Sequence, residues 1–186
     1  MGTETAIASG EVQVRLSGYG GQGIVLLGML LGKAAALHDR KEAVFTQSYG
    51  PEARGGASCA DVVIGDKPID YPLISNPDVL VALFQEAYMK YRPTLKPGGL
   101  LILESSLVHP KEDETDFCTL PATQMADELG RRIVSNVIVL GYLIGKTGVV
   151  SPEATLKAIA STVKPKTLDL NRRAFEAGYE RAVSEG

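Results

Sequence analysis

The sequence has few cysteines and no tryptophan, and its two cysteines stand far apart. Cys59 and Cys118 form no C-x-x-C pattern, the spacing that iron–sulfur clusters and structural zinc sites usually require. We therefore expect no metal centre in this chain. Both residues are expected to be packed thiols in a reducing cytoplasm.

Clustered positive charge is also missing. The chain carries 19 Lys and Arg against 22 Asp and Glu, for a formal net charge of −3, and no basic block stands out. This argues against a nucleic-acid footprint or an anionic membrane surface, since both need gathered positive charge. The two histidines, His38 and His109, suggest no Ser-His-Asp or Cys-His set, so no catalytic residue is predicted.

Long apolar runs and a secretory signal are absent as well. The apolar stretches are interrupted too often for a membrane span. The N-terminus, "MGTETAIASG", has no basic segment followed by an apolar one, so it is predicted to be a flexible leader over residues 1–10. Residues 11–186 are predicted to form one domain with a core of ordinary size, in a cytoplasmic protein.

Strand and helix patterns alternate along most of the chain. The alternation of "EVQVRLSG" (11–18) predicts a strand, and "GIVLLGMLLGKAAALHD" (23–39) predicts a buried helix packed closely on a sheet, helped by Gly28 and Gly32. Further strands are expected at 42–47, 59–64, 78–84, 98–105 and 117–122, and helices at 85–96, 131–148, 151–163 and 169–185. A turn at Gly65-Asp66 with a short return strand predicts an antiparallel hairpin. The fold class is α/β, a doubly wound, mostly parallel sheet with this hairpin and C-terminal helices.

A glycine motif joins the first strand to the first helix. Gly18, Gly20 and Gly23 satisfy G-x-G-x-x-G, which in a Rossmann-like fold lets the backbone approach a phosphate at a helix N-terminus. A dinucleotide enzyme also needs an acidic residue at the end of the second strand. Here that position reads Thr46-Gln47-Ser48. The motif therefore predicts either a binding site that uses residues other than those of a dinucleotide enzyme, or a tight turn with no ligand.

A second unusual segment is "TQSYGPEARGGAS", residues 46–58. It follows the second strand, so it is expected at the same carboxyl edge of the sheet as the glycine turn, where ligands and partners usually bind. Tyr49, Glu52 and Arg54 offer an aromatic ring and charges to a neighbour. A plain surface loop is the alternative.

Together these segments resemble the gamma subunit family of the 2-oxoacid:ferredoxin oxidoreductases, and most closely the 2-oxoglutarate enzyme's subunit. Pyruvate and branched-chain enzymes have related subunits. The motif "SYGPEARGG" at this distance behind "GYGGQG" is the specific part of the resemblance. The other matching segments are "PDVLVAL" (77–83), "LKPGGLLILES" (95–105) and "SNVIVLGYLIGKTGVVSPEATLKAI" (135–159).

The resemblance implies a non-redox subunit of an enzyme that converts a 2-oxoacid to an acyl-CoA and passes electrons to ferredoxin. Thiamine diphosphate, magnesium and the iron–sulfur clusters are then expected in partner subunits of the alpha, beta and delta types. Ferredoxin would be reached through those subunits, and coenzyme A would lie at the surface of this chain. The isolated chain is expected to be inactive.

The resemblance also implies which residues face coenzyme A or the partner subunits. For Gln22 a cap to the local backbone is the alternative, and for Arg54 an intrachain salt bridge. Asn136, in an apolar helix, is expected to bond the glycine loop or the sheet. The implied site residues are Gly20, Gly21, Gln22, Gly23, Ser48, Tyr49, Glu52 and Arg54.

Two other interpretations remain open from the sequence. One is a stand-alone Rossmann-like module that binds a nucleotide for regulation, and the other is a purely structural spacer. If the chain works inside an assembly, apolar patches meant for partners are expected on its surface. Alone, it is therefore predicted to form a homo-oligomer.

Overall fold

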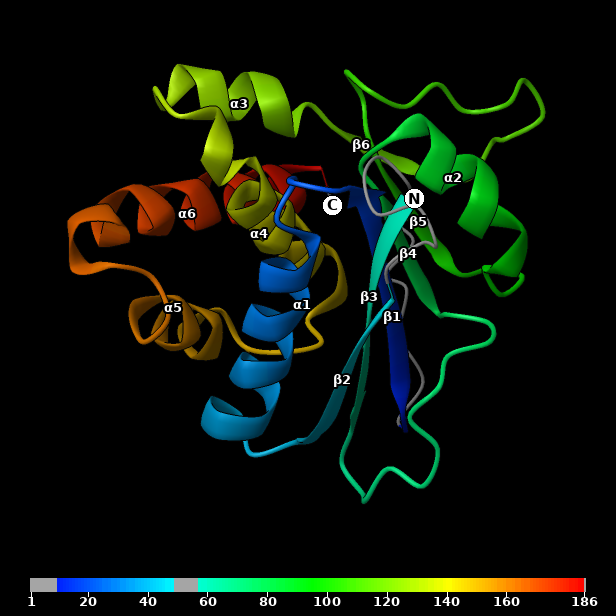
Figure 1. Ribbon diagram of the computed structural model, residues 1–186, viewed down its shortest axis with the longest axis horizontal. Coiled ribbons are helices and arrows are strands. Elements are labelled where there is room, and N and C mark those ends of the chain that lie inside the picture. The colour runs from blue at the N-terminus through cyan, green and yellow to red at the C-terminus, as the bar shows by residue number, and fades with distance from the viewer. Residues whose placement is uncertain (1–9, 49–56, 186) are drawn as a thin grey trace.

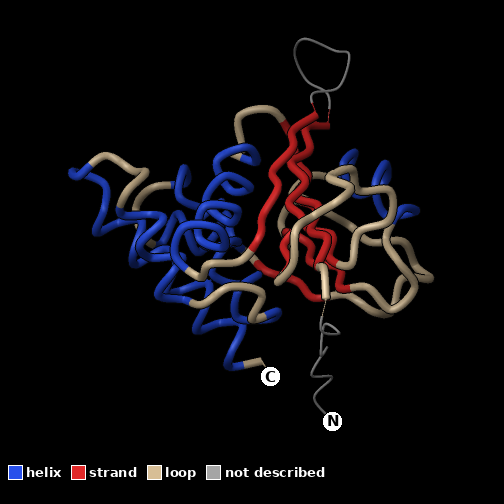
Figure 2. The backbone as a smooth tube through the Cα atoms, turned by 90° about the horizontal axis from the view of Figure 1, so that it is seen from below, coloured by secondary structure: helices blue, strands red, loops and turns tan. Residues whose placement is uncertain are grey.

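The computed structural model describes residues 10–48 and 57–185. They form a six-stranded sheet with helices on both faces (Figures 1 and 2). The strands are β1 Val12–Tyr19, β2 Glu42–Ser48, β3 Ala57–Gly65, β4 Val79–Ala82, β5 Leu100–Glu104 and β6 Cys118–Leu120. The α-helices are α1 Ile24–Lys33, α2 Gln85–Tyr91, α3 Ala122–Glu128, α4 Ser135–Thr147, α5 Pro152–Ala160 and α6 Leu168–Ser184. Short 3₁₀ turns lie at Arg92–Thr94, Arg132–Val134 and Pro165–Thr167.

The sheet confirms the expected α/β class. Its strand order is β2-β3-β1-β4-β5-β6. The pairs β1–β4, β4–β5 and β5–β6 are parallel, whereas β3 is antiparallel to both β1 and β2. Five strands therefore run in one direction, and only β3 runs against them.

The antiparallel hairpin exists, but its predicted place is wrong. It consists of β2 and β3, whereas the stretch 66–78 after Gly65 contains no strand. The reason is that both edges of β3 are already occupied. Its last residues pair with β1 on one side, as Val12 with Ile64, and with β2 on the other, as Glu42 with Gly65. A returning strand would find no free edge.

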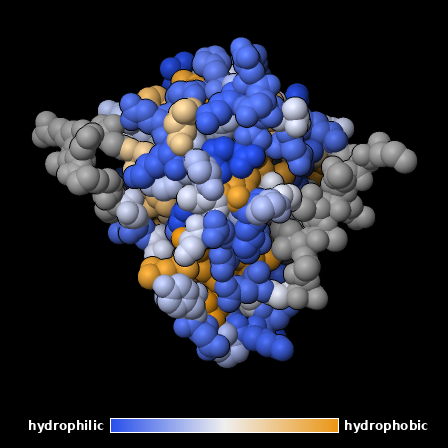
Figure 3. All heavy atoms as spheres, turned by 90° about the vertical axis from the view of Figure 1, so that its right-hand side faces the viewer, coloured by the Kyte–Doolittle hydropathy of each residue, from blue (hydrophilic) through white to orange (hydrophobic). Residues whose placement is uncertain are grey.

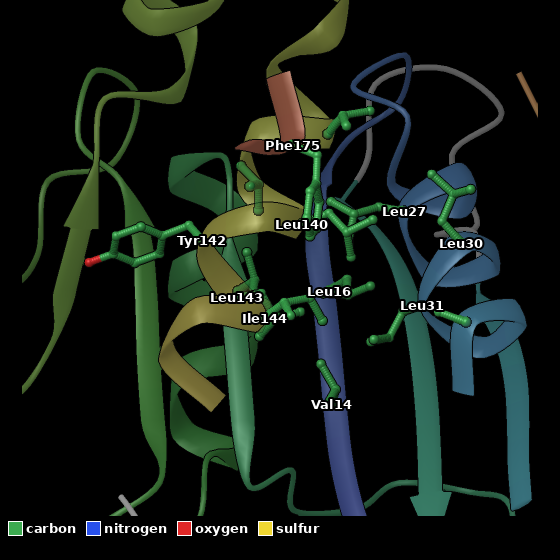
Figure 4. Close-up of a cluster of buried hydrophobic side chains, with 14 of the residues drawn as sticks. Val14, Leu16, Leu27, Leu30, Leu31, Leu140, Tyr142, Leu143, Ile144 and Phe175 are labelled. Atoms are coloured by element: carbon green, nitrogen blue, oxygen red, sulfur yellow. The ribbon is translucent and has the colours of Figure 1, made fainter. Parts of the chain in front are cut away.

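Two cores lie on the two faces of the sheet. The larger one joins β1 to α1, α4, α5 and α6, and Figure 4 shows Leu16, Leu27 and Leu140 meeting in it. The smaller one packs α2 with Tyr88 and Tyr91 on the opposite face. The close packing expected of α1 is found at Gly28, where an added Cβ would lie 2.7 Å from Phe45 and 2.9 Å from Ala60. Helix α1 continues into a π-helical turn, Ala34–His38.

Glycines also set the closest helix contact. An added Cβ at Gly178 of α6 would lie 1.9 Å from the Ile138 oxygen, and one at Gly141 of α4 would lie 2.1 Å from the Phe175 oxygen. Each helix thus presents a bare backbone to the other. Both helices were expected from the sequence, but this crossing was not.

The predicted helix boundaries near residue 150 are confirmed. Gly148 ends α4 with a φ of 59°, and Ser151 caps α5 by accepting a bond from the Ala154 amide. Helix α3 was not anticipated, because it is short and lies in a polar stretch without strong periodicity. Within the described ranges, no helix is long and apolar enough to cross a membrane.

Candidate functional site

The glycine turn connects β1 to α1 and depends on left-handed backbone. Its Gln22 amide donates to the Tyr19 oxygen at 3.1 Å. Gly21 has a φ of 102° and Gly23, the residue preceding α1, a φ of 74°. Residues with a Cβ rarely adopt these values. The spacing of the glycines thus serves the shape of the turn.

The Gln22 side chain is bound inside the protein. Its Oε1 accepts from the Tyr19 amide at 2.6 Å, and its Nε2 donates to the Leu83 carbonyl just past β4 at 3.0 Å. The structure therefore matches the alternative for this residue, a cap to the local backbone. Gln22 fastens the turn to the end of the neighbouring strand.

Asn136 of α4 supports the turn from the other side, and the expectation for it is confirmed. Its Nδ2 donates to the Gly23 carbonyl at 3.4 Å, while its Oδ1 accepts from the Val137 amide at 2.9 Å. A Cβ at Gly23 would lie only 2.3 Å from that Nδ2. The turn is consequently held between β4 and α4.

The tip of the turn is open. Gly20 and Gly21 are exposed, and an added Cβ at either would have no atom within 4 Å. The first amides of a helix have no partner within the helix, and the helix dipole adds partial positive charge there. Open backbone followed by the start of α1 suits an anionic group such as a phosphate.

Ser48 lies at the same edge of the sheet as the turn. It is exposed at the end of β2 and pairs with Cys59, two residues from the Ala57 that pairs with Tyr19 at the end of β1. The shared carboxyl edge expected for the two segments is therefore present. Tyr49, Glu52 and Arg54 lie outside the described residues.

The sheet also explains why the dinucleotide pattern is incomplete. In a Rossmann fold the strand beside β1 runs parallel to it and brings an acidic residue to the ribose. Here the neighbour on that side is β3, which runs the opposite way, and β2 lies one strand further out. The Thr46-Gln47-Ser48 end of β2 is thus displaced from the glycine turn by the width of one strand.

A buried ion pair between β1 and β3 was not predicted from the sequence. The Arg15 guanidinium donates to both Asp61 oxygens, at 2.9 and 2.7 Å, and to the Ile74 carbonyl at 2.7 Å. Burial lowers the pKa of Arg15, but the bonds and charge of Asp61 outweigh it and raise that pKa overall. The sequence does contain a signal for this pair, because each of two apolar strands has one charged residue near its middle.

Cys59 adjoins this pair. Its Sγ lies 3.2 Å from Asp61 Oδ1. Burial, with the Asp61 charge adding to it, raises the pKa of the Cys59 thiol to about 12. The residue is therefore a protonated, packed thiol. Across residues 10–48 and 57–185 there is no group of three or more His, Cys, Asp or Glu placed to hold a metal ion.

With this geometry in hand, comparison with known proteins identifies the family. The family model described as pyruvate ferredoxin/flavodoxin oxidoreductase matches residues 13–181, which is nearly the whole chain. The chain belongs to this family.

Individual relatives narrow the resemblance to one kind of subunit. The chain is 50% identical to the 2-oxoglutarate synthase subunit KorC of Methanocaldococcus jannaschii, covering 91% of this chain and 93% of that protein. Its fold superposes with a TM-score of 0.85 on the keto/oxoacid ferredoxin oxidoreductase gamma subunit from Geobacter sulfurreducens, at 42% identity, covering 95% and 98% of the two chains. These relatives do not favour a stand-alone nucleotide-binding module.

A more distant solved structure shares the fold within a longer chain. It is the 2-oxoglutarate:ferredoxin oxidoreductase from Magnetococcus marinus with 2-oxoglutarate, coenzyme A and succinyl-CoA bound, at 21% identity and a TM-score of 0.83. The match covers 95% of this chain but 32% of that one. The same fold therefore occurs both as a separate chain and as one part of a larger one.

Proposed function

We propose that this chain is the gamma-type subunit of a 2-oxoglutarate:ferredoxin oxidoreductase, which forms succinyl-CoA by oxidative decarboxylation. The observation that carries the proposal is the 50% identity to a 2-oxoglutarate synthase subunit that matches almost end to end. Relatives acting on other oxoacids are less similar, such as a pyruvate synthase subunit at 33% identity. The choice of 2-oxoglutarate rests on that difference.

In this proposal the chain contributes no redox centre. Thiamine diphosphate, magnesium and iron–sulfur clusters belong to partner subunits of the alpha, beta and delta types, and ferredoxin docks through them. Both cysteines of this chain are free, and Cys59 is buried. The residues of this chain would instead bind coenzyme A and position it for the reaction. A cytoplasmic location is part of the proposal, since free thiols suit a reducing compartment.

The glycine turn is the part of the chain proposed to face coenzyme A. Gly20 and Gly21 leave room for a phosphate near the first amides of α1. Ser48 at the same edge, together with Tyr49, Glu52 and Arg54, would line the approach to the active site and contact partner subunits. Gln22 and Gly23 would fix the shape of the turn, because Gln22 is bonded to Tyr19 and Leu83.

A pair of isosteric variants tests the coenzyme A contact in the assembled enzyme. Gly20→Asp places a carboxylate where the phosphate is proposed to lie, whereas Gly20→Asn places a neutral group of the same size there. Because the added carboxylate would repel a phosphate bound there, the KM for coenzyme A should rise roughly tenfold or more with Asp relative to Asn. Equal KM values for the two variants would remove coenzyme A from this turn.

Affinity purification tests the subunit role and the substrate. The tagged chain, recovered anaerobically from its native cell extract, should bring along thiamine-binding and iron–sulfur chains. The eluate should reduce a viologen dye with 2-oxoglutarate and coenzyme A faster than with pyruvate or branched-chain oxoacids. Recovery of the chain alone, combined with tight binding of NAD, FAD or ATP in calorimetry, would instead establish a nucleotide-binding module.

A further inference from the structure

Strands β1 and β4 are neighbours, and the helices that follow them lie on opposite faces of the sheet. The two strands run parallel, so both end at the carboxyl edge. Helix α1 follows β1 and packs in the larger core, whereas α2 follows β4 and packs in the smaller core on the other face (Figure 1). In an open α/β sheet, ligands bind where neighbouring strands send their helices to opposite faces. A ligand held at the glycine turn is therefore expected to extend along the edge between β1 and β4.

An aromatic pair lies at this edge. Tyr19 is the last residue of β1, and its ring centroid lies 5.3 Å from that of Phe84, the residue before α2, with the ring planes tilted by 54°. Ala57, which pairs with Tyr19, belongs to the smaller core, and Phe84 packs against the same core. Both rings are thus on the α2 face of the sheet, next to the open backbone of Gly20.

Tyr19 is fixed in place and still accessible. Its amide donates to Gln22 Oε1 at 2.6 Å, and its carbonyl accepts from the Gln22 amide at 3.1 Å. Phe84 supports the ring at a distance typical of favourable aromatic contacts. Tyr19 nevertheless remains 40% exposed. A ring that is already ordered loses little conformational entropy when a flat group stacks on it.

The surroundings favour a small ligand over a broad protein partner. In Figure 3 the α2 side of the molecule is largely hydrophilic, with small apolar patches among the described residues. Stable protein interfaces bury large areas around an apolar centre. An exposed ring beside open backbone amides suits instead a molecule that joins one flat ring to phosphates.

We propose that Tyr19 stacks on the adenine ring of coenzyme A while Phe84 holds the tyrosine in position, an inference that rests on the proposed function. Coenzyme A carries phosphates on the ribose of its adenosine, so a phosphate at the glycine turn leaves the base one sugar away. Tyr19 directly precedes Gly20, and neighbouring Cα atoms are about 3.8 Å apart. Stacking recognises the face of a base. Tyr19 therefore raises the affinity for coenzyme A over thiols that lack a base.

Two acceptors that differ in adenine test the stacking in the assembled enzyme. 4′-Phosphopantetheine has the thiol arm of coenzyme A but lacks its adenosine. Tyr19→Leu should raise the dissociation constant for coenzyme A, measured by calorimetry without oxoacid, roughly fivefold or more and leave that for 4′-phosphopantetheine unchanged. Tyr19→Phe retains the ring and should bind coenzyme A nearly as tightly as the wild type. Tyr71→Leu, the same change at a residue 63% exposed in the 66–78 stretch at the opposite edge of the sheet, should change neither constant.

The outcomes separate this proposal from the function on which it rests. Equal losses for both acceptors, or no loss for either, would mean that Tyr19 does not contact adenine. A Tyr19→Leu chain that no longer joins the complex, while Tyr19→Phe joins it, would make the ring a subunit contact and likewise overturn the proposal. In each case the comparison of Gly20→Asp with Gly20→Asn still decides whether coenzyme A lies at the turn. If those two variants also show equal KM values, the coenzyme A contact itself has failed.

Discussion

At the scale of single residues, the glycine turn shows how backbone and side chains specify one another. Gly23 is required twice, once for its φ of 74° and once because Asn136 occupies the space where a Cβ would be. Gln22 and Asn136 then use their amides to hold the turn rather than to offer free groups. Preorganisation of this kind keeps the open glycines in one arrangement.

Gly23→Ala should therefore destabilise the chain more than an equally strained control. Gly130 also has a positive φ, 86°, but an added Cβ there would have no atom within 4 Å. Gly130→Ala should lower the free energy of unfolding by about 1 kcal/mol from backbone strain. Gly23→Ala should lower it by about 2–4 kcal/mol because Asn136 must also move. Urea denaturation measures both, and equal losses would mean that the Asn136 contact is unimportant.

The two cysteines should differ sharply in reactivity. Since burial raises the pKa of Cys59 to about 12, its thiol stays protonated at pH 8, and only the thiolate reacts. Iodoacetamide should label Cys118, which is partly exposed, and spare Cys59 in the native chain. Mass spectrometry should find both residues labelled in urea. Rapid native labelling of Cys59 would contradict its packed position.

The same shift predicts a pH effect on stability. A thiol whose pKa is raised on folding favours the folded state fully below its unfolded pKa of 9.0. That contribution is lost as pH rises from about 9 toward 12, because the unfolded thiol ionises first. The unfolding free energy should fall less steeply across this range in Cys59→Ala than in the wild type. Parallel curves for the two proteins would mean that Cys59 does not contribute.

At the scale of elements, glycines allow α4 and α6 to cross at close distance and allow α1 to pack closely on the sheet. The atoms that an added Cβ would meet differ between the two places. At Gly178 and Gly141 the opposing atoms are backbone oxygens, which cannot turn away as a flexible side chain can. At Gly32 the atoms nearest to an added Cβ, at 3.7 and 3.9 Å, are at ordinary contact distance. The close packing of α1 on the sheet that the sequence predicts is therefore found at Gly28 and not at Gly32.

Alanine at these helical glycines should act in opposite directions. Gly178→Ala must separate α4 from α6 and should lower the free energy of unfolding by about 3 kcal/mol or more. Gly32→Ala should raise it by about 0.5–1 kcal/mol, because alanine restricts the unfolded chain and favours helix. Thermal or urea unfolding of the two variants gives the comparison. A destabilised Gly32→Ala would show that α1 has less room than the distances imply.

At the scale of the whole molecule, the sheet carries the open glycine turn at the carboxyl edge of its parallel strands. Five strands point to that edge, and helices cover both faces of the sheet (Figure 1). In the proposed enzyme this chain would contribute a binding surface, and the partner subunits would carry the redox chemistry. Its effect on a reaction must appear through the assembly.

Omission and return of the chain should make this visible. The purified chain alone should reduce no viologen with 2-oxoglutarate and coenzyme A. A complex prepared without it should lose activity, and adding the folded chain should restore it. The free chain unfolded by heat provides the control. Full activity without this chain would show that it is dispensable for turnover.

Local sequence patterns are enough to predict the element types and the turn chemistry. Apolar alternation predicts β1, continuous apolar runs predict β4 and β5, Ser151 and Pro152 predict the start of α5, and Gly148 predicts the end of α4. These features depend on neighbours within a few residues, so a local pattern contains them. The motif pair "GYGGQG" and "SYGPEARGG" likewise pointed to the family that the comparison found.

The way those elements pack together depends instead on contacts between distant parts of the chain. The insertion of β3 between β1 and β2, the Arg15–Asp61 pair and the crossing of Gly141 with Gly178 all join segments distant in sequence. The misplaced hairpin has the same origin, because a glycine turn after β3 is a local signal, whereas the edge it would need was already occupied by β1 and β2. Which strands pair depends on all the strands that the chain forms, so a local sequence pattern cannot predict it.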